Sequence, residues 1–452
     1  PVYHSGSYQD RTGLCFIRMA ILLGGIMAAS LAAPCSVSAA EKTTLTFWHA
    51  MGGTNGEVLQ QIVDDFNASQ DEIEIKAEYQ GTYDDTITKL KAAMQSDSGL
   101  PDVCQMYDVG TKFMYDSGAV IPVEDKFEST GYDKSSVMDV ISSYYTVEGK
   151  QYAMPFNVST PMLYYNKDVF EAAGLDPETP PTTYDEVLED AKKIVDSGAA
   201  PVGYSQAIYG WFFEQQLAGL GVTYGNNDNG RTEAVTAVDF DSNGGGLKVF
   251  DMWKKLYDSG CFEDYGTTTA DTQTAFFSGQ VGMIIESTAI LKNAVDSSPF
   301  EVGTGYLPRI EQNDEGGVII GGGSLWLTDT GNEANEDAAW KFIEYITTPD
   351  VQAKWSMGTG YFAINEKAYE TEDMKAYLKE NPNFETAINQ LKDSPVNCNT
   401  AGVLSGVQTE ARLTFNEIMP QVYDGKLTTQ DAVDQLAASV NKAIENYNES
   451  IK

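Results

Sequence analysis

Apolar residues recur along the chain at two spacings, and the two spacings alternate. Residues 45–48 and 73–79 run apolar or alternate as strands do, whereas Val58–Phe66 repeats its apolar residues with the 3.6-residue period of an amphipathic helix. A second helical stripe covers 87–94, and a short apolar strand follows over 101–107. Strand–helix–strand units at this interval predict an α/β fold with mostly parallel sheets that helices flank.

The same succession returns further along the chain. Residues 163–165 predict a strand, and Thr183 is placed to cap a helix whose apolar positions run over 187–194. The apolar stretch Val318–Trp326, glycine-rich in its middle, predicts a strand that crosses between two halves of the molecule. The last third is helical and ends in an amphipathic helix with its stripe over 436–444.

The length of the chain predicts two lobes, because 452 residues exceed one ordinary domain. We expect residues 41–154 and 287–335 to form lobe 1, and 155–286 and 336–452 to form lobe 2, after an upstream segment over 1–40. No low-complexity linker separates them, so ordered crossovers join the lobes. A ligand cleft is then expected between them.

The N-terminal region has the pattern of a secretory signal. An apolar run, Met19–Ala33, is followed by small residues, which predicts cleavage between about Ala39 and Lys42. Export to the periplasm or the outer cell surface follows. Lipid anchoring at Cys35 stays open, although Pro34 stands where such sites prefer Gly or Ala.

The chain is strongly acidic, with 66 Asp and Glu against 29 Lys and Arg and a net charge of −37. A chain of this charge repels nucleic acids and anionic membranes, so neither is an expected partner. Solubility outside the cytoplasm is the simpler explanation of the acidity.

Residues that could carry catalysis or bind a metal are sparse. After the leader His49 is the one histidine, which leaves too few ligands for a His-based metal site. A Ser-His-Asp or Cys-His site would have to use His49, and the sequence has no Gly-x-Ser-x-Gly elbow. The segment 226–230 resembles a calcium loop but lacks the Glu at the twelfth position, so a polar turn is expected. We therefore predict no catalytic residue, no metal and no cofactor. A chance pair of carboxylates keeps a secreted carbohydrate-active enzyme as an alternative.

The cysteines give no disulfide framework. Cys104, Cys261 and Cys398 follow the leader, an odd number without metal-ligand spacing. Buried thiols are expected, and a single bridge between Cys261 and Cys398 stays open.

Five segments, in order, carry a resemblance to a known family: Leu163–Phe170, Ala173–Pro177, Pro180–Glu186, Phe276–Met283 and Ala339–Ile343. They resemble the family 1 extracellular solute-binding proteins, and the likeness extends over residues 43–450. The resemblance implies a type II periplasmic-binding-protein fold with the ligand cleft between its lobes. It also implies a monomeric receptor that is not an enzyme and that delivers a small molecule to the permease subunits of an ABC importer.

Further segments resemble one branch of that family, the periplasmic receptors for glycerol-3-phosphate: 47–49, 105–111, 155–161, 319–326 and 359–361. The resemblance implies ligand-binding positions at Tyr83, Asp108, Ser159, Trp211, Ser287, Gly322, Tyr361 and Arg412. The residue types suit this ligand, because an Arg fork with hydroxyl and backbone donors holds a phosphate and a carboxylate accepts from glycerol hydroxyls.

Two departures from the branch bear on the ligand. Asp108 stands where the receptors carry the longer Glu, and Trp211 has Ile208 beside it where they carry a second Trp. A smaller wall leaves room for a head group, so a glycerophosphodiester is predicted beside glycerol-3-phosphate. A receptor for oligosaccharides is the main alternative, since the wider family mostly binds sugars.

Each position also has a structural alternative. Arg412 would be a solvated helix arginine, Asp108 a helix N-cap, and Ser159 and Ser287 caps at strand ends.

Overall fold

A computed structural model describes residues 42–96 and 99–452. The predicted leader, its cleavage site and Cys35 lie outside the described residues. Among the helices of the described part, none combines the length and the apolar character that a membrane span requires.

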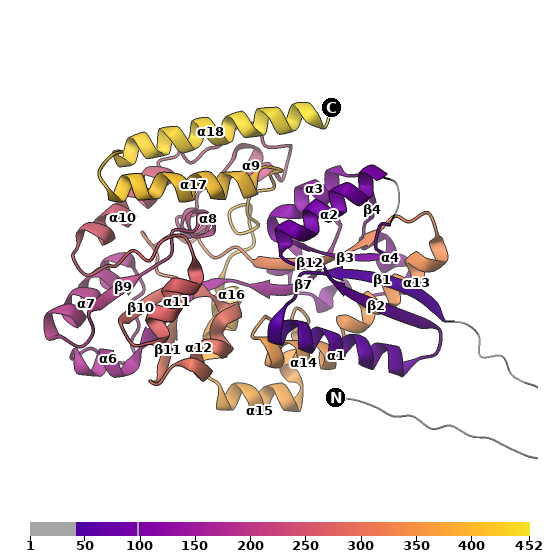
Figure 1. Ribbon diagram of the computed structural model, residues 1–452, viewed down its shortest axis with the longest axis horizontal. Helices are drawn as coiled ribbons and strands as arrows, with labels where there is room; N and C mark the ends of the chain where they lie inside the picture. The colour runs from indigo at the N-terminus through magenta and orange to yellow at the C-terminus, as the bar shows by residue number, and fades with distance from the viewer. Residues whose placement is uncertain (1–41, 97–98) are drawn as a thin grey trace, which may run out of the picture. The chain divides into compact units, whose positions relative to one another are not determined.

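The first sheet has six strands: β1 (Thr43–His49), β2 (Ile73–Tyr79), β3 (Val103–Tyr107), β4 (Val120–Ile121), β7 (Met154–Ser159) and β12 (Gly321–Thr328). Their order is β2-β1-β3-β12-β4, and β7 also pairs with β12. In Figure 1, α1 (Gly53–Ser69) lies below these strands and α2 (Tyr83–Ser96) above them. The buried stripe of α1 contains Leu59, Ile62, Val63 and Phe66, as the 3.6-residue spacing predicts.

The second sheet has the order β11-β8-β10-β9. Its strands are β8 (Pro161–Asn166), β9 (Val202–Ser205), β10 (Val281–Ser287) and β11 (Val302–Gly305). Alternate residues of β8 enter different hydrophobic clusters, Met162 and Tyr164 one and Leu163 and Tyr165 the other. Both faces of this sheet are therefore buried, which explains why β8 is apolar without alternation.

The remaining elements surround these sheets (Figure 1). Near the first sheet are α3 (Thr111–Asp116), α4 (Glu124–Thr130), α5 (Asp139–Ser142), α13 (Glu333–Ile346) and α14 (Pro349–Thr359), with the small ribbon β5 (Thr146–Val147) and β6 (Lys150–Gln151). The other helices are α6 (Lys167–Ala172), α7 (Tyr184–Ser197), α8 (Gly210–Gly219), α9 (Asn226–Gly230), α10 (Gly245–Asp258), α11 (Thr269–Phe277), α12 (Leu291–Ser297), α15 (Glu372–Glu380), α16 (Asn383–Asp393), α17 (Gln408–Tyr423) and α18 (Thr429–Ser450). Short 3-10 helices are η1 (Asp108–Gly110), η2 (Lys134–Ser136), η3 (Ser143–Tyr145), η4 (Thr288–Ile290) and η5 (Glu366–Glu370).

The two-lobed α/β architecture is confirmed, but the strand directions correct one detail of it. Both sheets are mixed instead of mostly parallel: β1 runs parallel to β2 and β3, whereas β12 is antiparallel to β3, β4 and β7. In the second sheet β8 is antiparallel to β10 and β11, and β9 and β10 are parallel. The antiparallel pairs come from strands of distant segments, which local strand–helix–strand spacing does not reveal.

Three segments belong to the opposite side of the molecule from the predicted boundaries. β11 pairs with β8 in the second sheet although 287–335 was assigned to lobe 1. β7 pairs with β12 in the first sheet. All of β7 except Met154 falls within 155–286, the range that was assigned to lobe 2. Trp340 and Phe342 of α13 pack into the cluster around β1, whereas 336–452 was assigned to lobe 2. Strand pairing and the apolar face of α13 determine these placements, and the chain therefore crosses between the lobes later than predicted at each of the three boundaries.

The predicted crossing strand begins three residues later than its apolar stretch. Val318–Ile320 precede β12, and side chains supply hydrogen bonds that a ladder would otherwise make. Gln215 donates to the carbonyl oxygen of Ile319 at 2.7 Å and accepts from its N–H at 2.8 Å. The N–H of Val318 donates to Ser394 Oγ at 3.1 Å. The cap at Thr183 is confirmed as a full capping box with Glu186.

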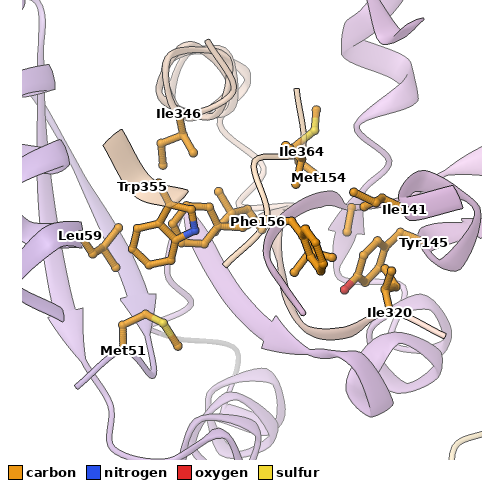
Figure 2. Packing of buried hydrophobic residues seen from close by; sticks show 14 of the residues in the cluster. Met51, Leu59, Ile141, Tyr145, Met154, Phe156, Ile320, Ile346, Trp355 and Ile364 are labelled. Carbon is orange, nitrogen blue, oxygen red and sulfur yellow. The ribbon is translucent and has the colours of Figure 1, made fainter. Parts of the chain in front are cut away.

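A row of aromatic rings connects the core to the cleft described below. Phe156 of β7 stacks on Trp355 of α14 (Figure 2), and the centroids of the two rings are 4.5 Å apart. Tyr361 extends this row: its ring is parallel to that of Trp355, and the two ring centroids are 5.8 Å apart. Tyr361 is therefore fixed by packing within the hydrophobic cluster.

The cysteines and the polar turn have structural roles. Cys104, Cys261 and Cys398 are all free thiols, so the bridge left open between Cys261 and Cys398 is absent from the described residues. In the turn over 226–230, Asn229 accepts from the N–H groups of two preceding residues and donates to the carbonyl oxygen of Cys398 at 2.9 Å. The segment labelled α9 is not a regular helix, because Asn227, Asp228 and Asn229 have positive φ angles of 56°, 53° and 60°. This agrees with the polar turn that the sequence predicts.

Candidate functional site

A cleft of about 640 Å³ brings all eight predicted ligand-binding residues together. They come from α2, η1, β7, α8, β10, β12, the segment after α14, and α17. The cleft is lined by Thr82, Tyr83, Asp84, Tyr107, Asp108, Val109, Ser159, Tyr209, Trp211, Thr267, Thr268, Thr269, Gln273, Glu286, Ser287, Ala289, Ile290, Gly321, Gly322, Tyr361, Thr409, Arg412, Leu413 and Asn416. Residues more than 300 positions apart thus share one polar and aromatic surface, since Asp108 and Arg412 are 304 positions apart.

Arg412 is held by two carboxylates. Its Nε donates to Glu214 Oε1 at 2.8 Å and its Nη2 to Glu214 Oε2 at 2.7 Å, which is a two-point contact. Nη2 also donates to Asp108 Oδ2 at 3.1 Å. The side chains are only 11% exposed for Arg412 and 8% exposed for both carboxylates. The alternative of a solvated arginine is therefore wrong.

The electrostatics of this group keep the guanidinium charged. Burial on its own would lower the pKa of Arg412, but Glu214 and then Asp108 raise this pKa well above its ordinary value. Nη1 of Arg412 makes no hydrogen bond to any described residue. The guanidinium of Arg412 is therefore an oriented cation, and its Nη1 hydrogens are available to a ligand.

A glycine allows Glu214 to reach Arg412. A Cβ at Gly210 would lie 2.5 Å from the Cα of Arg412, so the first turn of α8 and the middle of α17 are in close contact. The N–H of Gly210 donates to Asn416 Oδ1 at 2.9 Å. Glu214 lies one helical turn further along α8. The close helix pair thus fixes both halves of the Arg412–Glu214 contact.

Tyrosines form the opposite wall. Asn157 Nδ2 donates to the hydroxyl of Tyr83 at 2.6 Å, and the ring of Tyr83 stacks on Tyr107 at 5.2 Å. Burial raises the pKa of Tyr83 well above its ordinary value, and burial also raises the pKa of Tyr361. Both hydroxyls stay protonated at neutral pH and can donate to a ligand.

The hydroxyls of the two predicted serines, Ser159 and Ser287, differ in the hydrogen bonds that they make. Ser159 Oγ makes no hydrogen bond within the part of the chain that the structure describes, although the residue is buried at the end of β7. Ser287 Oγ accepts from the N–H of Ala289 at 3.1 Å and so caps η4, as the structural alternative supposed. Its hydroxyl proton remains available, because the cap uses Oγ as an acceptor. Asp108 is no N-cap, since that position of η1 belongs to Tyr107.

Gly322 occupies a position that only glycine tolerates. Its φ is 92°, and a Cβ there would collide with the carbonyl oxygen of Asn157. The strand register between β7 and β12 shifts at this point, between Gly322 and Ser324. Gly322 therefore brings its backbone to the cleft surface without a side chain.

Sequence reasoning missed two residues of the cleft lining, Tyr209 and Glu286, and also Glu214, which holds Arg412 in place. Glu214 was hidden because nothing local signals a pairing across 198 positions. Tyr209 precedes α8 and its ring lies 6.1 Å from that of Trp211, so Tyr209 supplies a second aromatic wall. Ile208, from which extra room was predicted, is buried and is not among the described cleft residues. Glu286 immediately precedes the predicted Ser287 on β10, and no motif of the sequence singled it out.

Carboxylates outnumber cations at the cleft. Asp84, Asp108 and Glu286 line it, and Arg412 is the one basic side chain among its described lining residues. Among the described residues, no group of three or more His, Cys, Asp or Glu side chains is arranged to hold a metal ion. His49 lies outside the cleft lining, and burial lowers its pKa to about 4.

A polar and aromatic cleft bounded by two α/β lobes is typical of two-lobed solute receptors. A profile described as "Bacterial extracellular solute-binding protein" matches residues 61–386 of this sequence. The chain belongs to this family of bacterial extracellular solute-binding proteins.

Curated relatives and solved structures agree with this assignment. The sn-glycerol-3-phosphate-binding periplasmic protein UgpB of Escherichia coli (strain K12) is 31% identical over 417 residues, which cover 91% of this chain and 94% of the relative. The cyclic alpha-maltosyl-1,6-maltose binding protein of Arthrobacter globiformis has a TM-score of 0.75 at 26% identity, covering 90% of this chain and 100% of that one. UgpB of Mycobacterium tuberculosis, solved with glycerophosphocholine, has a TM-score of 0.76 at 20% identity, covering 90% and 99%. The type II periplasmic-binding-protein fold is thereby confirmed.

Proposed function

We propose that this protein is an exported receptor that binds glycerol-3-phosphate or a glycerophosphodiester and delivers it to the permease subunits of an ABC importer. One observation carries the proposal: eight residues chosen from distant segments line a single cleft. The name of the E. coli relative, which is 31% identical, agrees with a glycerol phosphate. The proposal includes no enzymatic activity.

In this proposal, different cleft residues bind the phosphate, the glycerol hydroxyl and the carbon chain of the ligand. Glu214 holds Arg412 in place, and the remaining N–H groups of Arg412 donate to a phosphate oxygen. Ser159, Ser287 and the backbone at Gly322 complete the phosphate contacts. Asp108 accepts from a glycerol hydroxyl, and Trp211 and Tyr209 enclose the carbon chain.

Closure of the lobes supplies the link to transport. Tyr107 and Thr409 lie on opposite walls and their hydroxyls are 2.7 Å apart, while Asp108 and Arg412 form a second contact across the cleft. A ligand that enters must replace or join these contacts, so binding changes the relation between the walls. Docking of the closed form on a permease follows the hinge behaviour of two-lobed receptors.

An oligosaccharide receptor is the second candidate, and the charge balance and the aromatic lining of the cleft favour it. Arg412 is already compensated by Glu214 and Asp108, so the cleft has no excess positive charge for an anion. Stacked tyrosines and Trp211 also suit sugar faces. The Arthrobacter protein that shares the fold is named for a cyclic maltosyl sugar.

Calorimetric titration of the purified mature protein with glycerol-3-phosphate, glycerophosphocholine and maltose tests the proposal. Binding of either glycerol phosphate compound, with none of maltose, is expected. Ser159→Ala should weaken that binding, whereas Ser129→Ala, on the exposed helix α4, should not. Binding of maltose alone would replace the proposal with the sugar-receptor function. Mass spectrometry of the exported protein tests the leader, since an N-terminus at Cys35 would contradict cleavage near Ala39.

A further inference from the structure

Glu286 is a buried carboxylate at the cleft surface that the roles above do not use. It lies near the end of β10, it is 4% exposed, and it lines the cleft beside Tyr209 and Gln273. Gln273 Nε2 donates to its Oε2 at 3.0 Å, and the N–H of Ser287 donates to its Oε1 at 2.7 Å. Two neutral donors therefore fix the carboxylate.

No described residue gives Glu286 a positive partner. It forms no ion pair with any Lys, Arg or His in the described part of the chain. Arg412 shares the cleft, but its Nε and Nη2 are bonded to Glu214 and Asp108. A buried carboxylate without a cation is costly unless a ligand supplies the charge.

The surroundings of Glu286 have the composition of a cation site. The tyrosine ring of Tyr209 lies in the same lining, and burial raises its pKa to about 12, so it stays neutral. Tyr164, on the neighbouring strand β8, is buried and its pKa is also raised well above the ordinary value, first by burial and then by Glu286. Tyr164 does not line the cleft, so the ring that a ligand meets beside Glu286 is that of Tyr209. A carboxylate with a neutral aromatic ring in the same lining attracts ammonium and quaternary ammonium groups.

We propose that Glu286, Tyr209 and Gln273 form a head-group subsite that takes the cationic end of a zwitterionic glycerophosphodiester. This inference rests on the proposed function, because the glycerophosphate part occupies the cleft residues described above. The cation of the head group pairs with Glu286 while the phosphate stays with Arg412. Glycerophosphocholine and glycerophosphoethanolamine fit this chemistry, whereas glycerol-3-phosphate leaves the subsite empty.

The proposed pairing predicts that Glu286 releases a proton when a cationic head group binds. Burial raises the pKa of Glu286 to about 7, so a substantial fraction of the carboxyl is protonated in the free protein at pH 6.5. A bound cation favours the ionised form, and the proton leaves to the buffer. The heat of binding at pH 6.5 should therefore depend on the ionisation heat of the buffer for cationic diesters and much less for a diester with a neutral head group.

The test compares head groups within one ligand series. Wild type, Glu286→Gln and the surface control Glu189→Gln of α7 are titrated with glycerophosphocholine, glycerophosphoethanolamine and glycerophosphoglycerol, in PIPES and in imidazole at pH 6.5. Wild type and Glu189→Gln should bind the two cationic diesters at least about tenfold more tightly than glycerophosphoglycerol, as one lost charge-assisted contact implies. Glu286→Gln should abolish that preference and the buffer dependence.

The outcomes separate the two proposals. An unchanged preference for cationic diesters in folded Glu286→Gln protein overturns the subsite, as does the absence of any preference in wild type. If none of the diesters and no glycerol-3-phosphate binds wild type, the proposed function itself fails. Circular dichroism of Glu286→Gln verifies folding, and Glu286→Asp, which keeps the charge on a shorter side chain, should retain part of the preference.

Discussion

Removal of Arg412 tests the charge arrangement of the cleft more directly than any other change. Helix propensity alone predicts that Arg412→Ala leaves folding almost untouched, because Ala is a good helix former. The structure changes that expectation. Truncation would leave Glu214 and Asp108, both 8% exposed, without their cation. Breaking a buried pair in this way costs about 3–5 kcal/mol. We therefore expect the ligand-free variant to lose about that much stability.

A double-mutant cycle separates the stranded charge from the lost helix contacts. The cycle consists of Arg412→Ala, Glu214→Gln and the two changes combined, each unfolded with urea at pH 7 without ligand. Because Glu214→Gln removes the stranded charge, the combined variant should be more stable than the sum of the single effects predicts. Arg412→Lys should restore part of the stability, since an ammonium cannot make the two-point contact with Glu214. Additive single effects, or a loss below about 1 kcal/mol for Arg412→Ala, would refute the reasoning.

Binding follows from the same change. Arg412→Ala should lower the affinity for a glycerophosphodiester by at least about tenfold, the loss of one contact to a charged group. Titration is meaningful only at a temperature where the variant is still folded, which the urea curves establish.

Three further outcomes are expected. Gly322→Ala should lower the free energy of unfolding by about 1–3 kcal/mol, because the φ of 92° at this position strains any other residue. The substitution should also abolish measurable ligand binding. Urea unfolding checks the first outcome and calorimetry the second. A reducing agent should leave the melting temperature unchanged, because Cys261 and Cys398 are free thiols. The affinity for glycerol-3-phosphate, relative to that for glycerophosphoglycerol, should rise as the pH falls from about 7 to about 5. Only the monoester has a second phosphate pKa near 6, so only the monoester loses negative charge, and with it repulsion by the cleft carboxylates, in this range. A constant ratio of the two affinities across that range would contradict this prediction.

Local patterns predicted what local forces determine. The 3.6-residue stripe gave α1 with its buried face, and the Thr183 signal gave a capping box with Glu186. Both depend on residues within two turns of each other. The predicted cleft residues were found through motif resemblance, which already contains tertiary information.

The parts that sequence reasoning missed depend on distant partners. Gln215 provides hydrogen bonds to Ile319 from 104 positions away, so the predicted strand begins three residues late. Glu214 is a polar residue on a fully buried helix, and it pairs with Arg412 198 positions away. Its partner could not be chosen from the sequence, because the close approach depends on Gly210 against α17.

The charge balance of the cleft bears on which phosphate compound suits it. A monoester such as glycerol-3-phosphate carries between −1.5 and −2 charges at pH 7, whereas a diester carries about −1. Arg412 is already paired with Glu214 and in contact with Asp108, and Glu286 adds a further carboxylate to the lining. Each extra negative charge on the ligand is therefore repelled inside a partly desolvated site. A diester with a cationic head group has the lower total charge and also supplies a partner for Glu286. The same residues that weaken the argument for a free phosphate thus favour a zwitterionic diester over glycerol-3-phosphate.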